Sequence, residues 1–81
     1  MHFTYTLHAL QMLAQRDIHE EWVERTVLRP DLCEVDPKHT DRVRAFKAIP
    51  ERDGRVLRVV YVVANLDCRV ITLFFDRGRR R

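Results

Sequence analysis

The chain has 81 residues and a formal net charge of +3, enough for one small domain that buries only about 60% of its unfolded surface. Its longest uncharged apolar run, residues 59–64, has the length of a strand, so we expect neither a signal peptide nor a membrane span. Serine is absent, and the only glycines are Gly54 and Gly78. Serine-hydrolase chemistry and a glycine-rich phosphate loop are therefore excluded.

The positive charge is concentrated at the C-terminus. Residues 1–76 hold 11 of the 15 Lys and Arg and all 12 Asp and Glu, so this part has a net charge of −1. The sequence therefore predicts one domain over residues 1–76 and a basic tail over residues 77–81. Such a tail is typical either of a nucleic-acid anchor or of a solvated chain end. Its candidate nucleic-acid-binding residues are Arg77, Arg79, Arg80 and Arg81.

Two cysteines, Cys33 and Cys68, lie 35 positions apart, and neither has the Cys or His spacing of a metal site. We expect them to be small apolar side chains in a reducing cytoplasm rather than a disulfide. No metal-binding or nucleotide motif occurs, so the sequence predicts no metal and no cofactor.

Two helices are expected at the N-terminal end. Thr6 is a good N-cap for a helix over residues 7–16. A second helix begins within residues 18–23 and ends before Pro30. The expected buried stripe of the first helix is Leu7, Leu10, Leu13 and Ala14, and that of the second is Trp22, Val23, Thr26 and Val27.

After Pro30 the apolar pattern takes the period of strands. Strands are predicted over residues 32–36, 43–49, 55–64 and 68–76, and residues 50–54 form a strong turn signal. The last two strands are the most apolar and are expected to lie at the centre. The predicted fold class is α+β, in the order ααββββ, with both helices packed on one face of a mainly antiparallel, twisted sheet.

Arg58 interrupts the apolar run 56–63, where a buried strand would carry apolar side chains only. A guanidinium stays charged and is costly to bury without a partner. Alternation places Arg58 with Val56, Val60 and Val62. Two explanations remain open: Arg58 binds an anion such as phosphate at an open concavity, or it pairs beneath the helices with Glu20, Glu21 or Glu24.

Three other residues are candidates for chemistry. His8 is the second residue of the first helix, where the helix dipole disfavours the protonated imidazole, which suits a general base. Its alternative is a surface histidine with a local hydrogen bond. Arg16 is at the end of the same helix, where its alternative role is to bind the helix's own terminal carbonyls. Simple alternation along the last strand places Thr72 on the face of Cys68, Val70 and Phe74.

These residues resemble a family of small bacterial proteins with a domain of unknown function, which are similar to the RelE/ParE and BrnT toxins. The likeness covers roughly residues 4–75. In that family the position after Ile18 is usually Ser or Thr, and here it is His19, so the second helix is expected to be poorly capped. The matching segments are Thr6-x-His8-Ala9, Met12, Arg16-x-Ile18, Val23, Leu57-Arg58-Val59-Val60 and Val70-Ile71-Thr72.

The resemblance implies a RelE/BrnT-like, ribonuclease-like fold and metal-independent RNA cleavage, in which a ribose 2′-hydroxyl attacks the neighbouring phosphate. In that mechanism His8 moves protons, Arg16 and Arg58 hold the phosphate, and Thr72 donates a hydrogen bond. The expected partners are RNA and an antitoxin protein, with no membrane, and a homodimer is a further candidate assembly. The alternative function is a non-catalytic, toxin-like module that binds protein or nucleic acid.

Overall fold

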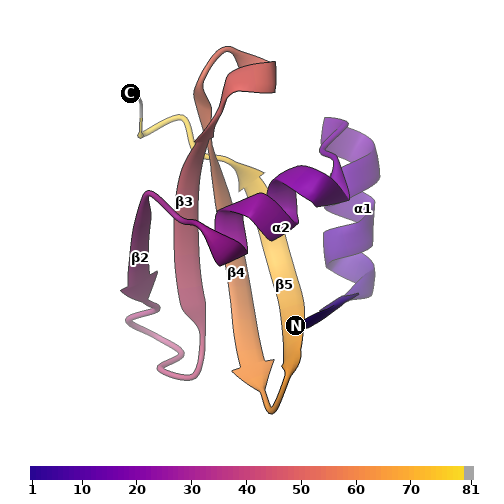
Figure 1. The fold of residues 1–81 in the computed structure, drawn as a ribbon, viewed down its shortest axis with the longest axis vertical. Coiled ribbons are helices and arrows are strands. Elements are labelled where there is room, and N and C mark those ends of the chain that lie inside the picture. The colour runs from indigo at the N-terminus through magenta and orange to yellow at the C-terminus, as the bar shows by residue number, and fades with distance from the viewer. Residues whose placement is uncertain (80–81) are drawn as a thin grey trace.

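The computed structural model describes residues 1–79 and consists of one strand, two helices and four further strands. The five strands form one mixed sheet in the order β1-β5-β4-β3-β2 (Figure 1). β1 is parallel to β5, and the remaining pairs are antiparallel. The elements are β1 His2–Tyr5, α1 Leu7–Arg16, α2 Glu20–Leu28, β2 Leu32–Val35, β3 Val43–Ile49, the 3-10 turn η1 Pro50–Arg52, β4 Arg55–Ala64 and β5 Asp67–Phe75.

The α+β class and the four predicted strands are confirmed, but the sheet has a fifth strand that the sequence did not indicate. Residues His2–Tyr5 pair with Asp67–Val70 along the outer edge of β5. Four residues are too few to show a strand period, and their partner lies more than sixty positions away. The prediction of helices first and of four strands is therefore wrong, whereas the sheet is mainly antiparallel as predicted, with β1–β5 as its one parallel pair among the described strands.

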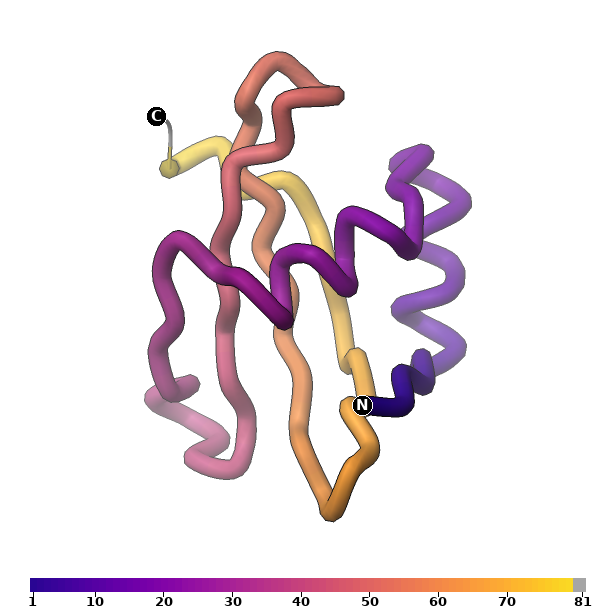
Figure 2. Tube along the Cα trace, viewed as in Figure 1, coloured from indigo at the N-terminus to yellow at the C-terminus, as the bar shows by residue number. Residues whose placement is uncertain are grey.

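The prediction that both helices pack on one face of the sheet is wrong. α2 crosses one face and packs on β4 and β3, whereas α1 lies beside β5 at the edge of the sheet (Figures 1 and 2). At the edge, α1 buries Ala9 fully and packs Met12 and Leu13 against the core. Leu7 and Leu10, expected to be buried, are 72% and 46% exposed. Among the described residues no helix is long and apolar enough to cross a membrane.

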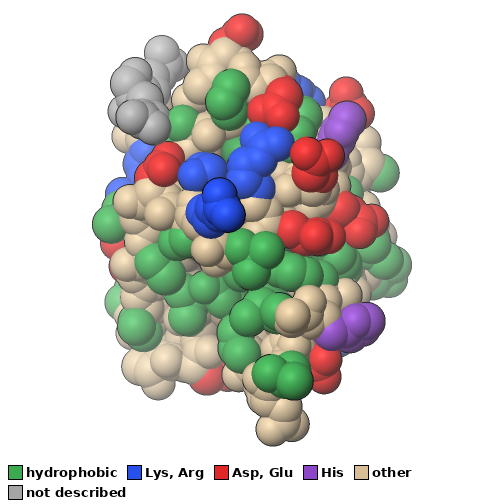
Figure 3. Space-filling view, in the orientation of Figure 1, with side chains coloured by type: hydrophobic (Ala, Val, Ile, Leu, Met, Phe, Trp, Pro, Cys, Tyr) green, Lys and Arg blue, Asp and Glu red, His purple; other side chains and the backbone are tan. Residues whose placement is uncertain are grey.

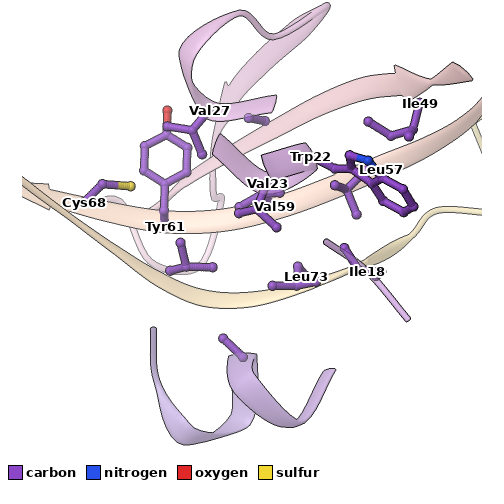
Figure 4. Packing of buried hydrophobic residues seen from close by; sticks show 13 residues of the cluster. Ile18, Trp22, Val23, Val27, Ile49, Leu57, Val59, Tyr61, Cys68 and Leu73 are labelled. Atoms are coloured by element: carbon purple, nitrogen blue, oxygen red, sulfur yellow. The ribbon is translucent and has the colours of Figure 1, made fainter. Parts of the chain in front are cut away.

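The predicted inner stripe of α2 is confirmed, because Trp22, Val23, Thr26 and Val27 are all buried. Trp22, Val23 and Val27 meet the strand residues of the core between α2 and the sheet (Figure 4). The N-cap His19 makes no capping hydrogen bond, as its identity suggested, and its ring stacks on Trp22 at 4.4 Å between centroids.

A β-bulge in β5 decides which side chains face away from α2. Tyr61 is opposite Val70, but Val60 is opposite Thr72, so Ile71 is an extra residue in β5. The bulge reverses the alternation after Val70. Thr72 therefore faces away from α2, and the expectation that it shares a face with Cys68 and Val70 is wrong.

Thr6 connects the start of α1 to this bulge. Its hydroxyl accepts a hydrogen bond from the Ala9 backbone N–H at 3.0 Å, which confirms the predicted N-cap, and donates one to the Ile71 carbonyl at 2.8 Å. Its backbone N–H also donates to the Val70 carbonyl at 3.1 Å. The first turn of α1 is thereby fixed to β5.

Replacement of Thr6 by Ala should lower the free energy of unfolding by about 1–2 kcal/mol, because one hydroxyl serves two backbone groups. In a domain of this size the melting temperature should fall by about 4–8 °C for each kcal/mol lost. Circular dichroism melting measures the change. Thr6→Ser keeps the hydroxyl and should retain most of the stability; an equal loss in both variants would assign the effect to the methyl group instead.

An ion pair joins α2 to η1. Arg25 donates two hydrogen bonds of 2.9 Å to the Glu51 carboxylate, and they lower the pKa of Glu51 from about 4.5 to about 2. Since the pKa is lower in the folded state, the pair stabilises the fold above about pH 4.5 and stops doing so as the pH falls through about 2.

The variant Glu51→Gln should therefore melt a few degrees below the unmodified protein at pH 7, and this difference should vanish near pH 2. Melting curves of both proteins between pH 2 and pH 7 measure it. A difference that is the same at both pH values would show that the charge of Glu51 contributes nothing to stability.

Candidate functional site

A row of three side chains crosses the face of the sheet that no helix covers. The strand register places Phe46 of β3 opposite Arg58 of β4, and Arg58 opposite Phe74 of β5. Side chains directly opposite each other in a sheet point to the same face. The Arg58 guanidinium carbon is 5.9 Å from the Phe46 ring centroid and 5.1 Å from that of Phe74, so the cation lies between two aromatic rings.

Arg58 has no acidic partner among residues 1–79. Its Nε is buried without a hydrogen-bond acceptor, and no ion pair reaches its guanidinium. The alternative in which Arg58 pairs beneath the helices with Glu20, Glu21 or Glu24 is wrong, because α2 packs on the opposite face. The predicted grouping of Arg58 with Val56, Val60 and Val62 is consistent with the register.

His8 and Thr72 meet beside this row. The His8 Nε2 is 2.9 Å from the Thr72 Oγ1, in a hydrogen bond between exposed groups whose direction depends on the imidazole tautomer. Thr72 and Phe74 are neighbours on the same face of β5. Thr72 is also diagonally opposite Arg58 of β4, and residues in such a pair are about 7–8 Å apart. Three of the four predicted catalytic residues, His8, Thr72 and Arg58, therefore lie together.

Arg16 is not part of this group. Arg16 is eight positions after His8 in α1, a rise of about 12 Å. Arg16 instead lines a cavity of about 830 Å³ at the other end of α1, together with Phe74, Phe75, Arg52, Arg55 and other residues. Arg52 donates hydrogen bonds of 2.8 and 2.9 Å to the backbone carbonyls of Arg16 and Asp17 at this end of α1. The capping role considered for Arg16 thus belongs to Arg52.

The predicted basic tail does not behave as one unit. Arg77 is exposed and lines the cavity near Arg16. Arg79 folds back on the sheet, 4.0 Å from the Phe46 ring centroid, and its guanidinium is 3.4 Å from Glu34 and 3.8 Å from Asp76. Arg80 and Arg81 lie outside the described residues.

The face that α2 covers has a different character. Asp and Glu side chains gather on its upper right part, over the helices, and a hydrophobic band crosses its lower half (Figure 3). Lys and Arg side chains lie beside these carboxylates near the upper centre of the view, so this face carries charges of both signs (Figure 3). The helix-free face, which carries Arg58, lies on the far side of this view.

Thiol and metal chemistry have little support in the geometry. Burial raises the pKa of the Cys68 thiol to about 11, so it is a poor nucleophile near neutral pH. Cys33 is exposed on β2 and, like Cys68, is not in a disulfide. Within residues 1–79 no group of three or more His, Cys, Asp or Glu could hold a metal ion.

Sequence reasoning missed four residues around the site: Phe46 and Phe74, which enclose Arg58, and Arg52 and Arg55, which line the cavity. The two phenylalanines could be found only from the register of three strands. The arginines did carry a signal, because Arg52 and Arg55 flank the predicted Asp-Gly turn and bring positive charge to the end of the sheet.

The chain matches a known family of domains. The model of the family described as Domain of unknown function (DUF4258) matches residues 5–75, which is most of the chain. No curated protein and no solved structure matches significantly. The matched range includes His8, Arg16, Arg58 and Thr72. The chain therefore belongs to the DUF4258 family of domains of unknown function.

Proposed function

We propose that the helix-free face binds RNA and that His8, Thr72 and Arg58 cleave it without a metal ion, as a small toxin-like endoribonuclease. The observation that supports this most directly is the environment of Arg58, a permanently charged side chain enclosed by two phenylalanines without an acidic partner among the described residues. A kinship with the RelE/ParE and BrnT toxins, with an antitoxin protein as inhibitor and action in the cytoplasm, is part of this proposal.

The energetic argument concerns the missing counter-charge. Burial of a guanidinium Nε without an acceptor destabilises the folded state, and contact with two rings offsets only part of that cost. A phosphate would supply the negative charge by pairing with the guanidinium nitrogens that are not buried, because the Nε itself is closed to a ligand. Arg58 is thus better suited to a bound anion than to the fold alone.

The chemical argument concerns the His8–Thr72 pair. In cleavage, His8 would take the proton of a ribose 2′-hydroxyl as that oxygen attacks the adjacent phosphorus. The bond from phosphorus to the 5′ oxygen then breaks, and the proton goes to that leaving oxygen. The products are a 2′,3′-cyclic phosphate and a 5′-hydroxyl. Thr72 would orient the imidazole, and Arg58 would stabilise the charge of the pentavalent intermediate.

A second candidate function is a non-catalytic module that binds RNA or a protein partner through the same face. The observation that favours it is the chemistry of the His8 contact, because Thr72 is a neutral hydroxyl and supplies no second acid or base. In this case the same residues would contact phosphate without cleaving it.

Purified protein in EDTA should cleave single-stranded RNA to products ending in a 2′,3′-cyclic phosphate. His8→Ala should slow cleavage by about 10²–10⁴-fold, the usual contribution of a general acid–base group. Arg58→Ala should slow it by about 10²–10³-fold, as for other groups that stabilise developing negative charge. Gel analysis of a labelled RNA measures both rates, and mass spectrometry identifies the ends.

Arg29→Gln is the matched control, because Arg29 is an exposed arginine after α2 and outside the site. It should cleave RNA like the unmodified protein, and all variants should be compared for thermal stability. RNA binding that depends on Arg58, without cleavage by the unmodified protein, would favour the binding module. Equal cleavage by His8→Ala would exclude His8 from the chemistry.

Replacement of Arg58 by Leu separates binding from stability. Since no described carboxylate would lose its partner, the melting temperature should stay the same or rise, while binding of sulfate and of RNA is lost. Differential scanning fluorimetry with and without sulfate measures both effects. A fall of more than about 10 °C would show that Arg58 is mainly structural.

Arg44→Leu is the contrasting control for stability. Arg44 of β3 faces the same side of the sheet as Arg58 of β4. Unlike Arg58, its guanidinium is 3.4 Å from Glu34 and 3.4 Å from Asp36. The backbone N–H groups of Lys38 and His39 and the neighbouring Arg44 lower the pKa of Asp36. Arg44→Leu removes one of these partners, so this variant should melt at a lower temperature than the unmodified protein.

A further inference from the structure

The cavity at the C-terminal end of α1 is lined by four arginines from different parts of the chain: Arg16 of α1, Arg52 of η1, Arg55 of β4 and Arg77 after β5. One carboxylate, that of Asp76, lines it with them. A second carboxylate, that of Asp17, is 3.9 Å from the Arg52 guanidinium. The four arginines and these two carboxylates leave a local excess of two positive charges at this end of the sheet.

Most of this charge is not neutralised by the protein. Asp76 accepts a hydrogen bond from the Gly78 backbone N–H at 2.9 Å and lies 3.8 Å from Arg79, so its carboxylate is directed to the tail. Within residues 1–79, the guanidinium groups of Arg16, Arg55 and Arg77 make no ion pair or hydrogen bond. Arg52 differs, because it holds two carbonyls at the end of α1 and serves a structural role.

The cavity also has an apolar wall. Met12, Phe74 and Phe75 line it, and the Arg55 guanidinium carbon is 4.6 Å from the Phe75 ring centroid. A volume of about 830 Å³ is within the range of sites that hold small organic ligands. Both rings are half-buried, and Arg52 also lies over the Phe75 ring at 5.3 Å. The guanidinium groups of Arg16, Arg55 and Arg77, which have no ion pair among residues 1–79, suit the phosphate of a nucleotide.

The position of the cavity relates it to the proposed cleavage site. Phe74 contacts Arg58 on the helix-free face and also lines the cavity, so the two places are contiguous. Thr72 and His8 at the cleavage site are well separated from Asp76 and Arg16 in the cavity. Thr72 and Asp76 are about 13 Å apart along the direction of β5, and His8 and Arg16 are about 12 Å apart along α1. One phosphate group cannot reach both ends.

We propose that the arginine cavity binds a second, internal phosphate of the same RNA strand whose scissile phosphate lies at Arg58. This inference rests on the proposed function, and it makes the substrate a single strand of several nucleotides that runs along β5 beside α1. Arg16, which the resemblance placed among the catalytic residues, is then a residue that positions the strand.

The test uses binding, so that cleavage is not required. A fluorescent 2′-O-methyl RNA hexamer with hydroxyl groups at both ends has only internal phosphates and no nucleophile. In anisotropy titrations, Arg55→Gln and Arg77→Gln should each weaken its binding about 3–10-fold. Each should also reduce the slope of log affinity against log salt by about 0.7, as expected for one lost contact to a single strand. Arg29→Gln, outside the cavity, should change neither quantity.

Strand length provides the second measurement. The cavity variants should lose several-fold more affinity for the hexamer than for the corresponding dinucleotide. Arg58→Leu should weaken the binding of both RNAs. Equal losses for the two lengths, or an unchanged salt slope for the hexamer, would overturn the inference. A loss seen only with a 5′-phosphorylated hexamer would also overturn it, because the cavity would then bind a terminal phosphate.

These results can be distinguished from failure of the proposed function. Binding that depends on the cavity, together with no cleavage of unmodified RNA in EDTA, would reject catalysis and keep the cavity as a phosphate site. Cleavage that depends on His8 and Arg58, together with full hexamer affinity in the cavity variants, would reject the cavity. Absence of any hexamer binding by the unmodified protein would reject both.

Discussion

The extra residue in β5 is the constraint on which the candidate site depends. Ile71 shifts the alternation of the strand, so that Leu73 is buried toward the core while Thr72 and Phe74 point to the helix-free face. The carbonyl of Ile71 then accepts the hydrogen bond from Thr6 that fixes the start of α1. One irregularity thus places Thr72 and brings His8 to it.

The division of the sheet into two different faces follows from the same packing. One face meets α2 and forms the main apolar core, and α1 covers only the edge at β5. The other face has no helix over it in the described part of the chain, but Phe46, Val56 and Val60 are buried there. Arg58 lies among these side chains with its Nε buried, so its charge is a cost to the folded state.

The sequence predicted many of the local features because they depend on neighbouring residues. Thr6 caps α1, the stripe of α2 is buried, Asp53 and Gly54 take positive φ in the turn, and Arg58 falls on the face of Val60. It failed for β1, for the buried side of α1 and for the direction of Thr72. Each failure involves a pairing between distant residues, which no local period contains.

The sequence by itself determined the α+β class, the bounds of α1 and the chemical types of the site residues, because propensity, capping and alternation act over a few positions. The tertiary structure decided which of these residues meet. It brought His8, Thr72 and Arg58 together, separated Arg16 from them, and assembled four arginines from distant segments into one cavity. The reason is physical: the register of the sheet and the position of α1 at its edge are set by the packing of the whole chain.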